Sequence, residues 1–158
     1  MINIQVVCVG NLKEDYFVKA TKEYEKRLGA FVKLNIVEVK ESPLPQNASV
    51  EQIKKAKQEE AALLSQKAKG FTICLEIGGK TFTSEAFSKK INELAVSGTS
   101  DITFFIGGSN GLDDNFSKSA NLQLSFSEFT FPHQLMRVIL LEQIYRAICI
   151  INNKTYHK

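Results

Sequence analysis

The sequence is poor in cysteine, with only three among its 158 residues, and no two of them form a CxxC pair. Cys8, Cys74 and Cys149 each lie inside an apolar segment, and no cysteine–histidine cluster has the spacing of a metal site. A disulfide framework and a structural metal are therefore not expected. We expect three reduced, buried and unreactive thiols in a cytoplasmic protein.

Long apolar runs and an excess of one charge are also missing. No run approaches the roughly 18 residues that cross a bilayer, and the start MINIQVVCVG lacks the basic region and cleavage site of a signal peptide. The 20 Lys and Arg residues against 17 Asp and Glu give a net charge of +3. This balance is compatible with a nucleic-acid partner, but charge alone does not provide high affinity for RNA.

The sequence does have the composition of a folded domain, with 44% hydrophobic and 23% charged residues. Apolar runs typical of strands alternate with segments of helical periodicity. This alternation predicts one α/β domain over residues 1–158, with a mostly parallel sheet covered by helices on both faces. Strands are expected at 3–9, 31–38, 71–77, 101–108 and 122–129, with a turn at 78–80, and helices at about 11–28, 49–69, 84–96, 112–120 and 132–151.

Ligands of such a sheet bind beyond the carboxyl ends of its strands. Three strand ends there have unusual sequences, and we expect the functional residues in them: LEIGGK (75–80), FIGGSNGL (105–112) and FSEFTFPH (126–133). The charged KKAKQEE stretch (54–60), by contrast, is expected to be a solvated helix face.

Two glycine motifs fail as phosphate-binding loops. A Walker loop ending in Gly79-Lys80-Thr81 would need glycine where the chain has Cys74, and a dinucleotide fingerprint from Gly107 would need glycine at Ser109. The segment 107–111 is therefore either a tight turn that requires glycine or a place where backbone groups approach a ligand. Because no cationic residue flanks this segment, the ligand would be an adenosine-type cofactor without phosphates.

Titratable side chains occur on the last helix. Glu142 and Arg146 are four residues apart in an otherwise apolar stretch. They either pair along the helix or lie at a dimer face or an RNA site. His133 is at the start of this helix, where a protonated imidazole is disfavoured, so we expect a neutral packing or hydrogen-bonding role.

The chain ends in Tyr156, His157 and Lys158. A histidine beside a C-terminus is usually a frayed residue, but its titration near neutrality also suits proton transfer. Tyr156 has a ring that can stack on an exposed base, and Lys158 can contact a phosphate. The residues alone leave both interpretations open.

The ordered combination of FIGGSNGL (105–112), FSEFTFPHQLMRVILLEQIYRA (126–147) and the terminal YHK (156–158) resembles the SPOUT class of RNA methyltransferases, and within it the RlmH family. The likeness extends over the whole chain. It implies S-adenosylmethionine-dependent methylation of N3 of a pseudouridine in 23S rRNA of the assembled ribosome. It also implies a homodimer and a C-terminal trefoil knot, with the knot and the cofactor site in roughly 71–158. Hydrophobic periodicity does not reveal a knot.

The resemblance also implies roles for individual residues. Three knot loops would hold the cofactor through Leu75, Gly107, Gly108, Ser127, Glu128, Phe129, Thr130, Phe131 and Pro132. The catalytic group would be Glu142, Arg146, Tyr156, His157 and Lys158. His157 is the candidate proton acceptor, because a weakly acidic imide nitrogen must lose its proton before it attacks. The tail of one subunit would complete the pocket of the other.

Two alternatives remain. A non-enzymatic ribosome-associated module would use the same surface without needing a cofactor in the glycine loop. A SPOUT methyltransferase could act on another RNA, such as tRNA, but the chain shows no appended RNA-binding domain. The small basic excess instead favours recognition of a large preformed surface by its shape. A hydrolase is not supported, because the G-x-S-x-G motif is missing.

Overall fold

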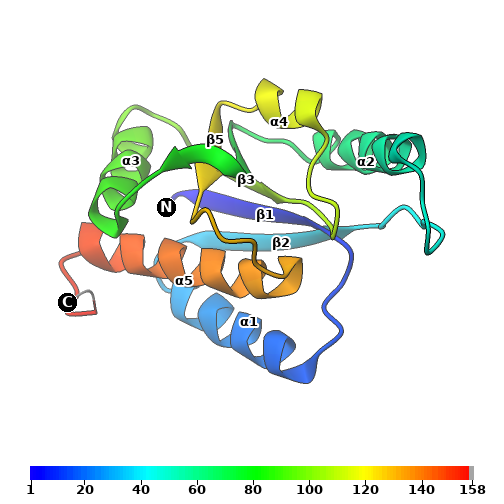
Figure 1. Cartoon of the computed structure of the whole chain (residues 1–158). Helices are drawn as coiled ribbons and strands as arrows, with labels where there is room; N and C mark the ends of the chain where they lie inside the picture. Colours follow the sequence, from blue (N-terminus) through cyan, green and yellow to red (C-terminus); the bar gives the residue numbers. More distant parts are fainter. Residues whose placement is uncertain (157–158) are drawn as a thin grey trace.

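A five-stranded sheet in the order β2-β1-β4-β3-β5 runs through the molecule (Figure 1). The computed structural model describes residues 1–156. Each pair of neighbouring strands is parallel, which confirms the prediction drawn from alternating strands and helices. The strands are β1 (Asn3–Val9), β2 (Lys33–Val39), β3 (Phe71–Thr81), β4 (Asp101–Ile106) and β5 (Leu122–Ser125).

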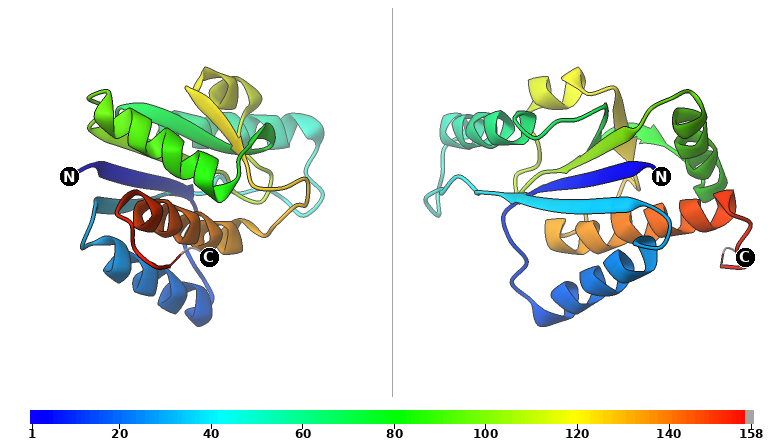
Figure 2. Two further views of the ribbon diagram at one scale, coloured as in Figure 1. Left: turned by 90° about the vertical axis from the view of Figure 1, so that its left-hand side faces the viewer. Right: turned by 180° about the vertical axis from the view of Figure 1, so that it is seen from behind.

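Helices cover both faces of the sheet (Figures 1 and 2). One face carries α1 (Asp15–Leu28), α3 (Ser84–Val96) and α5 (His133–Ile151), and the other carries α2 (Val50–Ser65) and α4 (Asp114–Ser119). Successive side chains of a strand point to opposite faces. In β4, Phe104 accordingly packs with the α1–α3–α5 layer, and Phe105 packs with the α2–α4 layer. Burial on both faces explains why the central strands are apolar throughout.

Several element boundaries differ from those expected. The segment 78–80 is not a turn, because β3 continues through it to Thr81 after a register shift between Leu75 and Lys80. Glycine is needed at position 79 because β3 and β5 lie close together there: a Cβ on Gly79 would lie 2.7 Å from the backbone of Gln123. The expected strand 122–129 ends at Ser125, where the chain leaves the sheet to form a loop.

The first two helices differ in how closely their ends agree with the ranges expected from the sequence. The second helix begins at a capping box, close to the expected residue 49: the Ser49 hydroxyl accepts from the Gln52 amide, and the Gln52 side chain accepts from the Ser49 amide. That helix ends at Ser65, earlier than the expected 69. The first helix begins after Glu14 without a side-chain cap, later than the expected start at about residue 11.

A buried arginine joins α5 to the carboxyl ends of β1 and β2. The Arg137 guanidinium donates to Glu38 Oε2 at 2.7 Å and to the Gly10 carbonyl at 3.2 Å. The Arg137 side chain is 3% exposed, whereas the Glu38 side chain is 42% exposed. Water can therefore replace a lost partner at Glu38 but not at Arg137.

This asymmetry predicts unequal costs for the two truncations. Glu38→Ala leaves a buried cation without its counter-ion and is expected to lower the free energy of unfolding by about 3–5 kcal/mol. Arg137→Met keeps the apolar stem and leaves a carboxylate that water reaches, so about 1.5–3 kcal/mol is expected. Urea unfolding of both variants measures the difference.

The matched control is the exposed pair of Arg27 and Glu23, whose side chains are 39% and 51% exposed. Glu23→Ala is expected to cost less than about 1 kcal/mol. A Glu38→Ala variant as stable as this control would contradict the role assigned to the buried pair.

Candidate functional site

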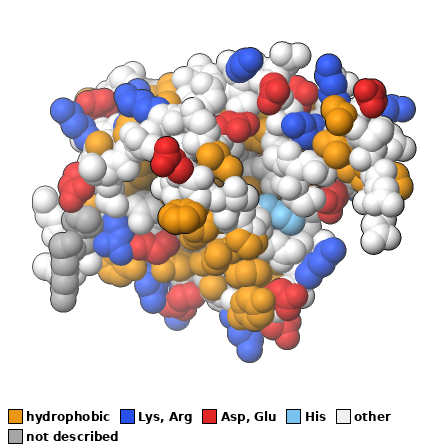
Figure 3. All heavy atoms as spheres, in the orientation of Figure 1, with side chains coloured by type: hydrophobic (Ala, Val, Ile, Leu, Met, Phe, Trp, Pro, Cys, Tyr) orange, Lys and Arg blue, Asp and Glu red, His pale blue; other side chains and the backbone are white. Residues whose placement is uncertain are grey.

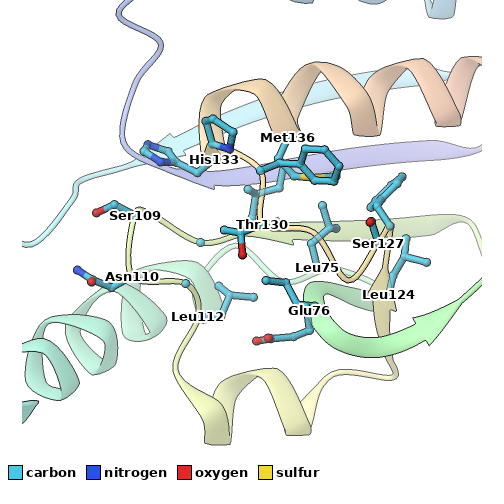
Figure 4. A pocket seen from close by; sticks show the side chains of 18 of the residues that line it. Leu75, Glu76, Ser109, Asn110, Leu112, Leu124, Ser127, Thr130, His133 and Met136 are labelled. Carbon is cyan, nitrogen blue, oxygen red and sulfur yellow. The ribbon is translucent and has the colours of Figure 1, made fainter.

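A pocket of about 720 Å³ opens beyond the carboxyl ends of β3 and β4, between the loop after β5 and the first turn of α5 (Figure 4). Three segments expected to carry function meet in its wall: 75–77, 106–112 and 126–133. The crossovers of a parallel sheet bring these strand ends to one edge although they are far apart in sequence.

The structure brings together most residues of the expected cofactor set. Those that line the pocket are Leu75, Gly107, Gly108, Ser127, Phe129, Thr130, Phe131 and Pro132. Glu128 is exposed and is not among the lining residues. The expected set therefore forms one continuous wall apart from this side chain.

The glycine loop is a tight turn and a pocket wall at once. The Gly111 amide donates to the Gly108 carbonyl at 3.0 Å, and Gly111 has a φ of +78°, which favours glycine. A Cβ on Gly107 would lie 2.6 Å from the carbonyl carbon of Gly111. The two interpretations of these glycines, turn formation and backbone exposure to a ligand, are thus not exclusive.

The loop after β5 is tied to the end of β3 by Ser125. The Ser125 hydroxyl donates to the carbonyl of Ile77 at 2.8 Å. Within the loop, the Ser127 hydroxyl accepts from the Phe129 amide at 3.0 Å. This turn leaves the Phe129 side chain 78% exposed at the pocket rim, an unusual exposure for a large apolar ring.

The charge around the pocket differs from that expected. Lys57 of α2 lines it, so the glycine loop does have a cationic neighbour, and the stretch 54–60 is not simply a solvated face. Glu60 of that stretch is buried, and its carboxylate accepts from the Ser42 amide at 3.0 Å. Burial raises the pKa of Glu60. The α2 contacts were missed because periodicity within a helix does not say which loop packs against it.

Further lining residues that were not expected belong to the same strand ends. Glu76 and Asp114 bring carboxylates to the pocket. His133 and Met136, from the first turn of α5, cover one side of it (Figure 4). His133 was expected to have a neutral packing or hydrogen-bonding role and was not assigned to the cofactor set, although it lies in the expected segment 126–133. Its position as the last residue of that segment was the available signal.

A second group of expected residues lies elsewhere on α5. Arg146 Nε donates to Glu142 Oε1 at 2.9 Å, which confirms pairing along the helix. The Arg146 guanidinium lies 4.9 Å from the centre of the Tyr156 ring. His157 and Lys158 lie outside the described residues.

Within one chain, this second group does not reach the pocket. Tyr156 packs edge-on against Tyr145, with 4.8 Å between ring centres. Tyr145 follows His133 by about 18 Å along the helix axis, at 1.5 Å per residue. His133 in the pocket wall begins α5, whereas Tyr156 follows the last residue of this helix, Ile151, so the pocket and the Tyr156 group lie at different ends of α5.

Metal binding and thiol chemistry have no support among the described residues. Residues 1–156 contain no group of three or more His, Cys, Asp or Glu side chains that could hold a metal ion. Cys8, Cys74 and Cys149 are buried and unpaired, as expected, and burial raises the pKa of Cys8 and of Cys74 to about 12. Among the helices described, none is long and apolar enough to span a bilayer.

Known proteins share this sequence and this fold. The family model described as "Predicted SPOUT methyltransferase" matches residues 2–157. Ribosomal RNA large subunit methyltransferase H of Desulforamulus reducens is 47% identical over 160 residues, covering 100% of both chains. A relative from Methanococcus maripaludis, which bears the same name provisionally, is 52% identical over 159 residues, covering 99% of this chain and 100% of its own.

Solved structures agree on the fold. A methylase family protein from Haemophilus influenzae superposes with a TM-score of 0.56 at 12% identity, covering 98% of this chain and 70% of its own. A tRNA methyltransferase from Aquifex aeolicus gives 0.51 at 15% identity, covering 92% and 69%. Because the sequence identities are low, these similarities support the α/β fold alone. By its match to the family model and its near-full-length relatives, the chain belongs to the SPOUT methyltransferases, among the ribosomal RNA large subunit methyltransferase H proteins.

Proposed function

We propose that this protein methylates ribosomal RNA of the large subunit with S-adenosylmethionine as methyl donor. The observation that carries the proposal is the pocket formed where three strand ends meet, in a chain about half identical over its length to proteins named for that reaction. A binding module without catalysis would not require a pocket of this size at the glycine loop.

The pocket suits an adenosine-type ligand. Its walls carry apolar side chains from Leu75, Leu112 and Leu124, which can cover an adenine ring, while the glycine loop offers backbone donors and acceptors. Carboxylates such as Glu76 can accept from ribose hydroxyls. Among the described residues that line the pocket, Lys57 is the one Lys or Arg, and it is available for the methionine carboxylate. We assign the cofactor to the eight lining residues of the expected set, with Glu128 at the rim.

The tasks left to the protein's own groups are positioning and proton removal. S-adenosylmethionine supplies a methyl group on a sulfonium, which is a good leaving group. Positioning alone can contribute about 7–11 kcal/mol in favourable cases. We assign proton removal to His157, supported by Tyr156 and Lys158, with Glu142 and Arg146 orienting the tail.

The proposed target is N3 of a pseudouridine in 23S rRNA of the assembled ribosome. A net charge of +3 is small for a protein that binds naked RNA through phosphates. A preformed ribosomal surface would supply contacts over a larger area, so that shape would select the site. A tRNA substrate is the alternative.

We further propose a homodimer formed through α5. The face of this helix opposite the sheet carries half-buried Leu135, Val138 and Ile139 together with Glu142 and Arg146. Figure 3 shows apolar side chains gathered over this side of the molecule. A helix with apolar residues on its outer side as well as toward the core usually packs against a further element there. An antiparallel partner helix would bring the Tyr156 end of one α5 toward the pocket at the start of the other.

The first prediction concerns the glycine loop. In Gly107→Ala the new methyl group collides with the Gly111 backbone, so the loop must move and the cofactor affinity should fall at least about tenfold, or about 1.4 kcal/mol. Calorimetric titration with S-adenosylmethionine measures this. Gly78→Ala is the control, because Gly78 has no atom within 4 Å of its Cβ position and does not line the pocket. Equal affinity in both variants would count against cofactor binding here.

The second prediction tests substrate and reaction. Unmethylated assembled ribosomes, isolated large subunits, naked rRNA and tRNA are incubated with the protein and S-adenosylmethionine labelled in its methyl group. Label is expected in 23S rRNA of assembled ribosomes only. Label in tRNA, or in naked rRNA at the same rate, would overturn the proposed target. Absence of cofactor binding would overturn the methyltransferase proposal itself.

The third prediction tests completion of the pocket by the partner. At a concentration of S-adenosylmethionine well below the Kd of Gly107→Ala, this variant and a chain truncated after Thr155 should each show little transfer while remaining folded. Mixed by co-refolding, they should recover about a quarter of wild-type transfer, because half of the dimers are mixed and each of these has one intact site. Mixtures as inactive as the separate variants would show that pocket and tail act within one chain.

A further inference from the structure

The last turn of α1 contacts the tail region of α5 through an aromatic and cationic cluster formed by Tyr24, Arg27, Tyr145, Arg146 and Tyr156. The Arg27 guanidinium lies 5.4 Å from the ring centre of Tyr24 and 5.7 Å from that of Tyr145. The rings of Tyr24 and Tyr145 are 6.3 Å apart, and those of Tyr145 and Tyr156 are 4.8 Å apart. Neither α1 residue belongs to the pocket or to the three loops.

The end of α5 folds the chain back onto this cluster. The Lys154 amide donates to the Cys149 carbonyl at 2.8 Å, and the Asn153 amide donates to the Ile150 carbonyl at 3.2 Å. Asn153 has a φ of +54°. These are the features of a Schellman end, which reverses the chain direction after a helix.

The tail beyond this turn has few other contacts. Residues 152–155 are exposed, and Tyr156 is the first tail residue to be half-buried again. Its ring meets Tyr145 on one side and the Arg146 guanidinium on another. Burial, followed by the neighbouring Tyr156 side chain, raises the pKa of Tyr24, which agrees with close approach of the two phenols. The direction of the tail therefore depends on how the Tyr156 ring is held.

Both cations of the cluster are themselves fixed. Arg27 Nε donates to Glu23 Oε1 at 3.0 Å, one turn earlier on α1, and Arg146 is held by Glu142. A guanidinium with its carboxylate partner keeps one orientation over a ring better than a free one. The buried residues of α1 are Thr21 and Leu28, and half-buried Tyr24 packs against the same core. Arg27, with 39% of its side chain exposed, is not needed to keep α1 on the sheet, so its replacement tests the cluster without removing core packing.

We propose that Tyr24 and Arg27 of α1 are positioning residues that act through Tyr145 and Tyr156 to hold the C-terminal tail in the direction required for transfer. This rests on the proposed function, in which the tail completes the pocket of the partner. The two residues do not touch the cofactor, and their effect is on the geometry of the catalytic tail. Helix α1, which supplies no residue to the pocket wall, would thus contribute to the geometry of the site.

The test compares Tyr24→Ala and Arg27→Ala with Lys22→Ala, an exposed α1 residue outside the cluster. Methyl transfer to assembled ribosomes should show kcat lowered about 10- to 100-fold in the first two variants, the size of effect that a misplaced catalytic group produces. The KM for S-adenosylmethionine and its calorimetric affinity should remain at wild-type values. Arg27→Lys should recover part of kcat, because a lysine can still lie over the rings. Wild-type kcat in Arg27→Ala would overturn the proposal.

A second measurement does not need activity. The chain has four tyrosines, so fluorotyrosine labelling gives four fluorine resonances, with exposed Tyr16 as the reference outside the cluster. Arg27→Ala should shift the Tyr145 and Tyr156 resonances and leave that of Tyr16 in place. An unshifted Tyr156 resonance would overturn the proposal.

The two measurements separate failure of this inference from failure of the proposed function. If the wild-type protein transfers no methyl group to any RNA, the proposed function fails. The response of the Tyr156 resonance then still decides whether α1 holds the tail. If the wild type is active and both α1 variants keep full kcat, only the positioning role is lost.

Discussion

The packing of α5 across the sheet is the constraint on which the rest of the site depends. Its first turn supplies His133 and Met136 to the pocket wall, and its far end leads into the turn that places Tyr156. Arg137, one turn into the helix, bonds to Glu38 and Gly10 at the strand ends. The same contact that holds α5 on the sheet thus sets the position of the pocket wall relative to β1 and β2. A shift of this helix would change the pocket and the tail together.

A rigid helix between two functional groups has a consequence for assembly. The pocket and the Tyr156 group are separated by most of the length of α5, and a straight helix cannot fold back on itself to join them. A second copy, packed on the outer face of α5 in the opposite direction, can join them. The half-buried Leu135, Val138 and Ile139 on that face then have a purpose that the single chain does not provide. Oligomerisation is, in this proposal, part of the catalytic geometry.

The sequence predicted the architecture and the pocket segments well, because both depend on local patterns. Alternating periodicity is sufficient for a parallel sheet, and the carboxyl ends of its strands are the ligand edge. What it could not predict depends on contacts between distant elements. Gly79 looked like a turn residue but allows close approach to Gln123, and Lys57 reaches the glycine loop from a helix that looked solvated. The trefoil knot stays a prediction from the family resemblance.

The use of arginine bears on how this small protein would recognise RNA. Arginine is the side chain best suited to bidentate phosphate contacts, yet each of the chain's three arginines is paired with a glutamate of its own fold: Arg27 with Glu23, Arg137 with Glu38 and Arg146 with Glu142. These guanidiniums hold a helix on the sheet or orient aromatic rings. Phosphate contacts are therefore left mainly to lysines, which bind as mobile point charges without fixed geometry. In the proposed function, phosphate contacts would give this protein little specificity, and the fit of its rigid surfaces to a rigid target would supply the selectivity.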